Sequence, residues 1–272
     1  MPNSLDIVLS DFNNDIGRVE NILNLTKLFR EFGASEPPAY ADTDPAWTEA
    51  VNLHVESKER RTDMPIISGS LLLYTAGRFE YFVRQIVEAM TDEIAEKTSD
   101  FKKMPPSIQK AIKQKTLEIA QNPRKYGHDE SSSEILLEQL VQNIKGTGGK
   151  VSINSTVISI TEANMRPTVL ADLLKIVGIL DFWREIGKQT PVKLALETKT
   201  EPETTAEAQK ILNTIMEERN QIAHPTGTTT FPDTDQVLKF ATFLKLLAAN
   251  IADQGKLYLN DLVNPPATNR PH

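Results

Sequence analysis

The strongest pattern in this sequence is an apolar stripe that begins near Ile66 and extends into the 90s. Its members recur three or four positions apart, as one broad face of a long helix requires: Leu72, Ala76, Phe79, Val83, Ile86, Val87 and Met90. Similar stripes occupy residues 16–29, 106–119, 167–177 and 237–247. The chain has only 12 glycines and 6% aromatic residues, which disfavours a β sandwich. We therefore predict an all-α fold.

The ends of several predicted helices carry recognisable signals. Pro167 suits a first helical turn, and Asp233 can cap the last strong helix. Thr204 and Glu207 have the spacing of a capping box, which would open the helix that runs toward Pro225.

Two segments fit helices less well. Alternating apolar residues leave a small β-hairpin open over residues 150–160, and the polar stretch 187–205 is expected to be mobile. The chain of 272 residues, 39% of them apolar, can build one large core or two small ones. We expect an N-terminal helix and loop over residues 1–65, a helical domain over 66–256 and a flexible tail over 257–272.

Composition removes several classes of chemistry. The sequence contains no cysteine and only four scattered histidines, so disulfides, thiolate catalysis and His/Cys metal sites are not expected. The glycine-rich segment Gly146–Ser152 has Val151 where a phosphate-binding Walker loop needs Ser or Thr. We therefore expect no metal and no cofactor.

The first residues lack the basic start and apolar run of an export signal, and no apolar stretch is long enough to span a bilayer. These features predict a cytoplasmic protein without a membrane segment. The net charge of −7 argues against a uniformly basic surface for nucleic acid, but it permits a local basic patch.

The most informative segment is Arg219-Asn220-Gln221-Ile222-Ala223-His224, which Pro225 follows. Helical spacing places Arg219 along the apolar stripe, and Pro225 should end the helix beside His224. Residues five apart on one helix point roughly 140° away from each other, so one copy of this pair does not converge, whereas two copies across a twofold axis could. Alternatively, Arg219 pairs with a carboxylate such as Glu218, and His224 merely terminates the helix.

This segment resembles the signature of the HEPN superfamily of helical ribonucleases and nucleotide-binding domains: Arg, a polar residue, three further positions and His. Two other segments are similar to the RiboL-PSP-HEPN group within it. They are Ala76–Val83 and Asn164–Pro167, the latter followed by Leu170, Leu173, Leu174, Gly178 and Ile179. The resemblance spans roughly residues 66–245 and implies a HEPN-like helical bundle, here with extra helices.

The resemblance also implies a metal-independent endoribonuclease that acts on RNA as a homodimer, as a toxin or anti-phage defence effector with an antitoxin or defence-system partner. His224 would transfer protons, Arg219 would hold the scissile phosphate, and Asn220 would orient either group. Glu80 and Glu218 are candidate supporting residues. The product would carry a 2′,3′-cyclic phosphate.

Two alternatives remain open from the sequence. The chain can instead be a non-catalytic HEPN-like module that binds nucleic acid or protein. It can also be a toxin that its partner modifies, although Thr226 stands where one HEPN subgroup has its modified tyrosine.

Residues 101–128 are basic, whereas the chain as a whole is acidic. They contain seven basic side chains and the single acid Glu118. This asymmetry predicts a path for the RNA backbone along Lys110, Lys113, Lys115, Arg124 and Lys125. The alternative is a solvated helix face.

Overall fold

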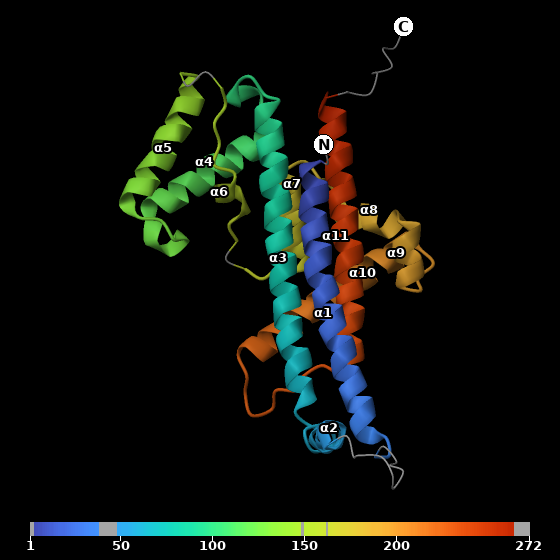
Figure 1. The fold of residues 1–272 in the computed structure, drawn as a ribbon. Helices are drawn as coiled ribbons and strands as arrows, with labels where there is room; N and C mark the ends of the chain where they lie inside the picture. Colours follow the sequence, from blue (N-terminus) through green and yellow to red (C-terminus); the bar gives the residue numbers. More distant parts are fainter. Residues whose placement is uncertain (1–2, 38–47, 148–149, 162, 264–272) are drawn as a thin grey trace. The chain divides into compact units, whose positions relative to one another are not determined.

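The computed structural model describes residues 3–37, 48–147, 150–161 and 163–263. Over these residues it contains eleven α-helices, two short 3₁₀ helices and no β-strand, which confirms the all-α prediction (Figure 1). The helices are α1 Ser4–Ala34, α2 Thr48–Glu59, α3 Met64–Glu96, η1 Phe101–Lys103, α4 Pro106–Gln121, η2 Pro123–Tyr126, α5 Glu130–Lys145, α6 Thr156–Ser159, α7 Pro167–Ile176, α8 Phe182–Lys188, α9 Thr190–Ala195, α10 Glu201–Ala223 and α11 Thr234–Val263.

The β-hairpin that the sequence left open over residues 150–160 does not form. Residues 150–155 are irregular and lead into α6. The side-chain amide of Asn143 takes the place of a strand partner: Nδ2 donates to Ser152 O at 2.5 Å, and Oδ1 accepts from Ser152 N at 3.2 Å. Asn154 then accepts from Thr156 N at 3.2 Å and turns the chain into the short helix.

The chain divides into two compact units, and the boundaries fall inside α1, α3, α10 and α11. Unit 1 comprises Met1–Asp11, Glu80–Leu212 and Leu246–His272. Unit 2 comprises Phe12–Phe79 and Asn213–Lys245.

Unit 2 is built on the facing apolar sides of its helical segments. Phe12 and Phe79 are fully buried and meet edge to face, with ring centroids 6.1 Å apart. Beside them, Arg78 of α3 forms an ion pair with Asp15 of α1 at 2.6 Å. The apolar core of this unit includes Ile16, Val19, Leu23, Leu72, Ala76, Ile215, Met216, Val237, Ala241 and Leu244.

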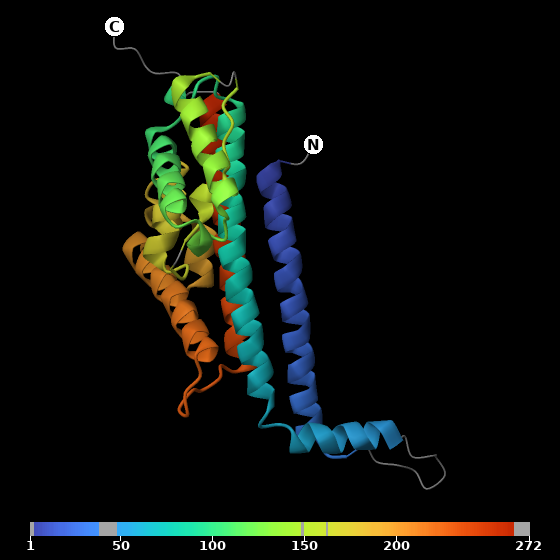
Figure 2. The ribbon, with the colours of Figure 1, turned by 90° about the vertical axis from the view of Figure 1, so that its left-hand side faces the viewer.

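Helix α2 lies across the C-terminal end of α1 (Figure 2). A side chain at Gly33 would come within 2.6 Å of the Ser57 carbonyl carbon, so only glycine allows this approach. The buried His54 of α2 lies with Nε2 3.0 Å from Ser35 O. The segment expected as one helix and a loop therefore contains a second helix; its residues 38–47 lie outside the described part of the chain.

In unit 1, α4, α5 and α6 form a group (Figure 1) around the buried side chains of Ile119, Leu136 and Val157. The stretch 187–205, which was expected to be mobile, is mostly helical, because α8 and α9 occupy most of its first nine residues and α10 begins at Glu201. Gly187 explains the tight packing there: an added Cβ would lie 2.3 Å from Thr205 Oγ1.

The predicted capping box at Thr204 and Glu207 does not begin α10, and the residue that caps this helix lies four residues earlier. Thr200 Oγ1 accepts from Glu203 N at 3.4 Å, and Glu203 Oε2 accepts from Lys199 N at 3.1 Å. Thr204 instead lies within the first turn and donates to Thr200 O at 2.8 Å. The predicted cap of α11 is confirmed, since Asp233 Oδ1 accepts from Gln236 N at 2.7 Å.

Helix α11 continues to Val263, past residue 257, where a flexible tail was expected to begin. Leu259 is buried, and Lys256 pairs with Asp253 at 2.8 Å and with Asp6 at 3.0 Å. These contacts stabilise the last turns of α11. Residues 264–272 lie outside the described part of the chain.

Candidate functional site

The Arg219–His224 segment forms the last turn of α10 and the first residue beyond it. The helix ends at Ala223, and His224 N still donates to Asn220 O at 3.1 Å. Pro225 disfavours helical dihedral angles at the residue before it, so the predicted ending beside the imidazole is confirmed. His224 is exposed to solvent, unlike its buried neighbour Ile222.

Arg219 and Asn220 lie side by side at this helix end. Arg219 follows Ile215, which is fully buried, along one face of α10 and is itself half-buried. Arg219 Nη1 donates to Asn220 Oδ1 at 3.1 Å. A guanidinium carries five N–H donors in a rigid fork, which suits a phosphate or carboxylate group. The amide therefore orients a cationic fork five residues before an exposed imidazole.

Glu218 connects α10 to the first turn of α11. Its Oε1 accepts from Gln236 Nε2 at 2.6 Å, while within the described structure its buried Oε2 has no hydrogen-bond partner. Burial raises the pKa of Glu218 above the ordinary value, and the hydrogen bond from Gln236 opposes that rise. Glu218 thus lies in the same unit as the Arg219–His224 segment and braces the helix turn that carries it.

The connection between α10 and α11 is fixed at its far end by two contacts with α3. Phe231 lies against Gly69, where an added Cβ would come within 2.4 Å of Phe231 Cδ1. The hydroxyls of Ser68 and Thr234, both buried, lie 3.1 Å apart in a hydrogen bond. The sequence pattern alone does not pair Phe231 with Gly69. The available signal was a glycine inside a long helical stripe, which disfavours helix unless packing requires it.

Glu80, the other predicted supporting acid, belongs to unit 1. Its Oε1 accepts from Met165 N at 3.2 Å, which joins the two segments that carried the family resemblance besides the Arg/His motif. Arg166 follows at the N-cap position of α7 with no side-chain capping bond, and its carbonyl accepts from Leu170 N at 2.9 Å. Trp183 Nε1 donates to Pro167 O at 2.9 Å.

The predicted basic path also lies in unit 1, but its members do not form one row. Lys110 and Lys113 are exposed on α4 and lie three residues apart, on one face. Lys115 points elsewhere and pairs with Glu118 at 2.7 Å, and this hydrogen bond is the largest cause that lowers the pKa of Glu118.

The remaining two members of the basic path, Arg124 and Lys125, are exposed on η2. Two of the five lysine and arginine side chains lie near aromatic rings. Lys113 Nζ is 5.8 Å from the Phe101 ring centre, and Lys125 Nζ is 5.3 Å from that of Tyr126.

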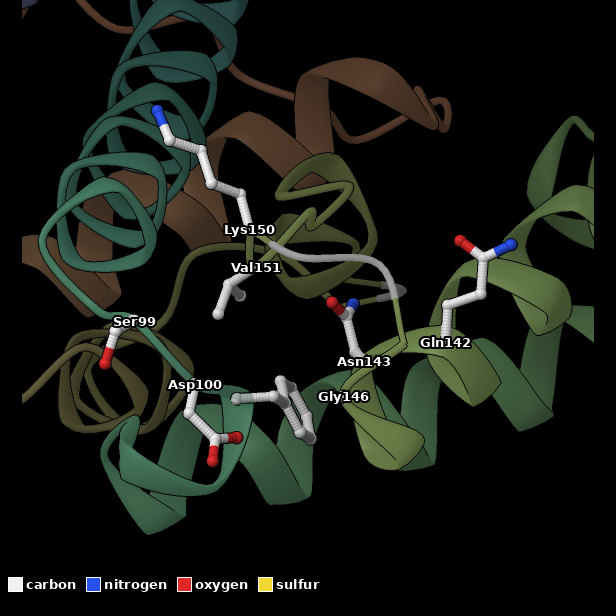
Figure 3. Close-up of a pocket in the computed structure, with 8 residues that line it drawn as sticks. Ser99, Asp100, Gln142, Asn143, Gly146, Lys150 and Val151 are labelled. Carbon is white, nitrogen blue, oxygen red and sulfur yellow. The ribbon is translucent and has the colours of Figure 1, made fainter.

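A cavity of about 150 Å³ in unit 1 lies between the start of η1 and the end of α5 (Figure 3). Two of its polar side chains are engaged: Asp100 accepts from Lys102 N at 2.9 Å, and Asn143 Nδ2 donates to Ser152 O. Figure 3 shows the ammonium group of Lys150 directed away from Asp100. This cavity therefore presents no convergent acid–base pair.

No group of three or more His, Cys, Asp or Glu side chains within the described residues is arranged to hold a metal ion. Within the same residues, no helix combines the length and the apolar character that crossing a bilayer requires.

One comparison identifies a relationship. A family model described as RiboL-PSP-HEPN matches residues 48–254. This span begins with α2 and includes the Arg219–His224 segment, the Ala76–Val83 segment and the start of α7. No curated protein and no solved structure matches the chain.

Proposed function

This chain belongs to the RiboL-PSP-HEPN family, and we propose that it is a metal-independent endoribonuclease that cleaves RNA with Arg219, Asn220 and His224. The observation that carries the proposal is the exposed imidazole just beyond the end of α10, close in sequence to an arginine that an amide orients. This is the combination that RNA cleavage by its own 2′-hydroxyl requires: a group that moves protons near neutral pH and a fork that binds phosphate.

In the proposed reaction, one His224 imidazole takes the proton from a ribose 2′-hydroxyl. The 2′-oxygen attacks the adjacent phosphorus, and the bond to the 5′-oxygen of the next nucleotide breaks. A second imidazole, in its protonated form, gives a proton to that leaving oxygen. The products are a 2′,3′-cyclic phosphate and a 5′-hydroxyl end. Arg219 stabilises the charge that develops on the phosphoryl oxygens, and Asn220 holds its guanidinium in place.

The second imidazole comes from a second copy of the chain in this proposal. Arg219 and His224 lie five positions apart, and on a helix such residues point in directions roughly 140° apart. A homodimer with twofold symmetry would bring the two pairs into one cleft. Light scattering at micromolar concentration tests this assembly: an active monomer would contradict it.

The direct test incubates the full-length protein in EDTA with end-labelled tRNA and mRNA. The wild type should cleave, and His224→Ala should lose at least about a hundredfold in rate. His128→Ala, a half-buried histidine of unit 1, serves as the matched control and should retain activity. Activity that disappears in EDTA and returns with magnesium would overturn the proposal. RNA binding without cleavage would favour the alternative, a non-catalytic HEPN-like module.

We extend the proposal to a toxin or defence effector under the control of an antitoxin or defence-system partner. Expression of such an enzyme should arrest bacterial growth, and His224→Ala should abolish the arrest. Arrest that is equally strong with the His224→Ala variant would separate toxicity from RNA cleavage and contradict this extension.

A further inference from the structure

We propose that Phe231, held against Gly69 of α3, is the positioning residue that fixes the exposed His224 imidazole for proton transfer. The inference rests on the function proposed above. It adds a residue from outside the Arg/His motif and assigns a purpose to a glycine inside a long helix.

Gly69 lies in the interior of α3. A glycine there destabilises a helix relative to alanine, so its presence needs a reason. Its backbone has no positive φ angle, which leaves space as the explanation. An added Cβ would lie 2.4 Å from Phe231 Cδ1 and 3.1 Å from Cε1, so the ring occupies the volume where any other side chain would begin. Gly77, on the same helix, has nothing within 4 Å of its added Cβ.

The far end of the connection is held by contacts with α3 and α10. Beyond Phe231, Pro232 is buried, and the Ser68–Thr234 hydrogen bond ties the start of α11 to α3. Gln236 then reaches back to Glu218, the residue before Arg219. The connection that carries His224 is therefore fixed at both ends, by α10 on one side and by the Gly69 contact on the other.

The turn between these ends contains two hydrogen bonds of its own. Thr226 N donates to Thr229 Oγ1 at 2.8 Å, and Thr229 N donates to Thr226 O at 3.1 Å. These bonds close the turn on itself and limit the slack between His224 and Phe231. In this proposal, a displacement of the Phe231 ring moves the turn and, with it, the imidazole. In a proton-transfer site, a misplacement of about 1 Å can lower the rate about a hundredfold.

The test compares Gly69→Ala with Gly77→Ala in the full-length protein. Both changes add one methyl group to α3, but only the first meets the Phe231 ring. We expect Gly69→Ala to lower kcat on end-labelled RNA by about tenfold or more with KM nearly unchanged, and Gly77→Ala to leave both constants unchanged. In the Phe231→Leu background, Gly69→Ala should lower kcat much less than it does in the wild type, because the smaller, rotatable side chain can move away from the new methyl group.

A second readout does not depend on cleavage. The imidazole NMR signals of His224, assigned with His224→Ala, should shift or broaden in Gly69→Ala, whereas adding Gly69→Ala to Phe231→Leu should change them less. Signals that stay unchanged in Gly69→Ala would overturn the positioning role, even if the wild-type protein cleaved no RNA. An inactive wild type with shifted signals would overturn only the proposed ribonuclease.

If Gly69→Ala does not fold, Phe231→Leu alone gives the same comparison. It removes ring contacts without adding atoms at Gly69, and it should lower kcat and broaden the His224 signals. A wild-type kcat and unchanged imidazole signals in a folded Phe231→Leu protein would overturn the proposal.

Discussion

The end of α10 in unit 2 and the basic surface of α4 and η2 in unit 1 were both expected to contact RNA, and they are organised in different ways. At the end of α10, neighbours in sequence hold one another, as Arg219 and Asn220 do, and Glu218 is tied to α11 through Gln236. On α4, Lys115 does not share the face of Lys110 and Lys113, and it pairs with the nearby acid Glu118. Residues within one helix turn lie close together whatever the rest of the fold, so their arrangement can be predicted from the sequence. The number of basic residues in a segment, by contrast, does not show which of them share a face.

The largest expected effect separates chemistry from general affinity. Arg219→Ala should lower the rate of the cleavage step at saturating protein by at least about a hundredfold, because it removes donors to the developing phosphoryl charge. Lys110→Ala should leave that step nearly unchanged, because it lies in the other unit. Single-turnover kinetics checks both, with circular dichroism and light scattering to confirm fold and assembly. Equal losses in the two variants would remove the distinction between the regions.

The next effect concerns RNA binding, measured with the His224→Ala background so that no substrate is cut. Lys110→Glu/Lys113→Glu removes two exposed charges from one face, and we expect the slope of log affinity against log salt to become shallower by about 1.5. Lys115→Glu, the matched control, should change the slope little, because Lys115 is already paired with Glu118. An unchanged slope in the double variant would identify α4 as a solvated face.

A smaller effect tests the brace at Glu218 through pH. Burial raises the pKa of this carboxyl above the ordinary 4.5, so the folded protein holds the proton more tightly than the unfolded chain. The stability that this carboxyl contributes is therefore fully present below pH 4.5 and is lost as pH rises through the raised pKa. Glu218→Gln keeps an acceptor for Gln236 without the buried charge, so it should raise the melting temperature at neutral pH but not in mild acid.

The exposed neighbour Glu217 provides the control for this measurement. Glu217→Gln should show no comparable difference between neutral and mildly acidic pH in a thermal unfolding series. A Glu218→Gln protein that melts below the wild type at neutral pH would mean that the carboxylate is stabilised by its surroundings, contrary to the expected sign.

The smallest effect lies in the basic region. Lys115→Ala breaks a partly exposed ion pair between residues three apart on one helix, and such pairs contribute about 0.2–0.5 kcal/mol. Urea unfolding should therefore show a loss within that range. A loss above about 1 kcal/mol would show that Lys115 has a structural importance comparable to that of a core residue, and the contrast with the end of α10 would weaken.

Local rules were sufficient where one residue decides the outcome. Pro225 ends α10 and Asp233 caps α11, as the sequence predicts, because each acts on its own backbone. The start of α10 was misplaced because Thr200/Glu203 and Thr204/Glu207 have the same spacing. Pro202, which favours the first helical turn, was the signal for the earlier pair.

Contacts between distant residues set the remaining features. Nothing near Ser152 in the sequence reveals that the amide of Asn143 bonds to its backbone and displaces a strand. Likewise, Gly69 and Phe231 are far apart in the chain, so the sequence contains the glycine signal but not its partner. Glu80 was assigned to the site as a supporting residue, and the hydrogen bond it makes to Met165 depends on a contact 85 residues away.

The hydrogen bonds of Trp183 make it an internal optical reporter. Its indole N–H donates to Pro167 O, and its own carbonyl accepts from Thr205 Oγ1 at 3.0 Å, so one residue links α7 to α10. The chain has only two tryptophans, and a Trp47→Phe variant would leave a single emitter. Its emission would shift to longer wavelength when this part of unit 1 opens to water, while the imidazole signals of His224 follow unit 2. Denaturation followed by both signals would distinguish a single cooperative transition from two separate ones.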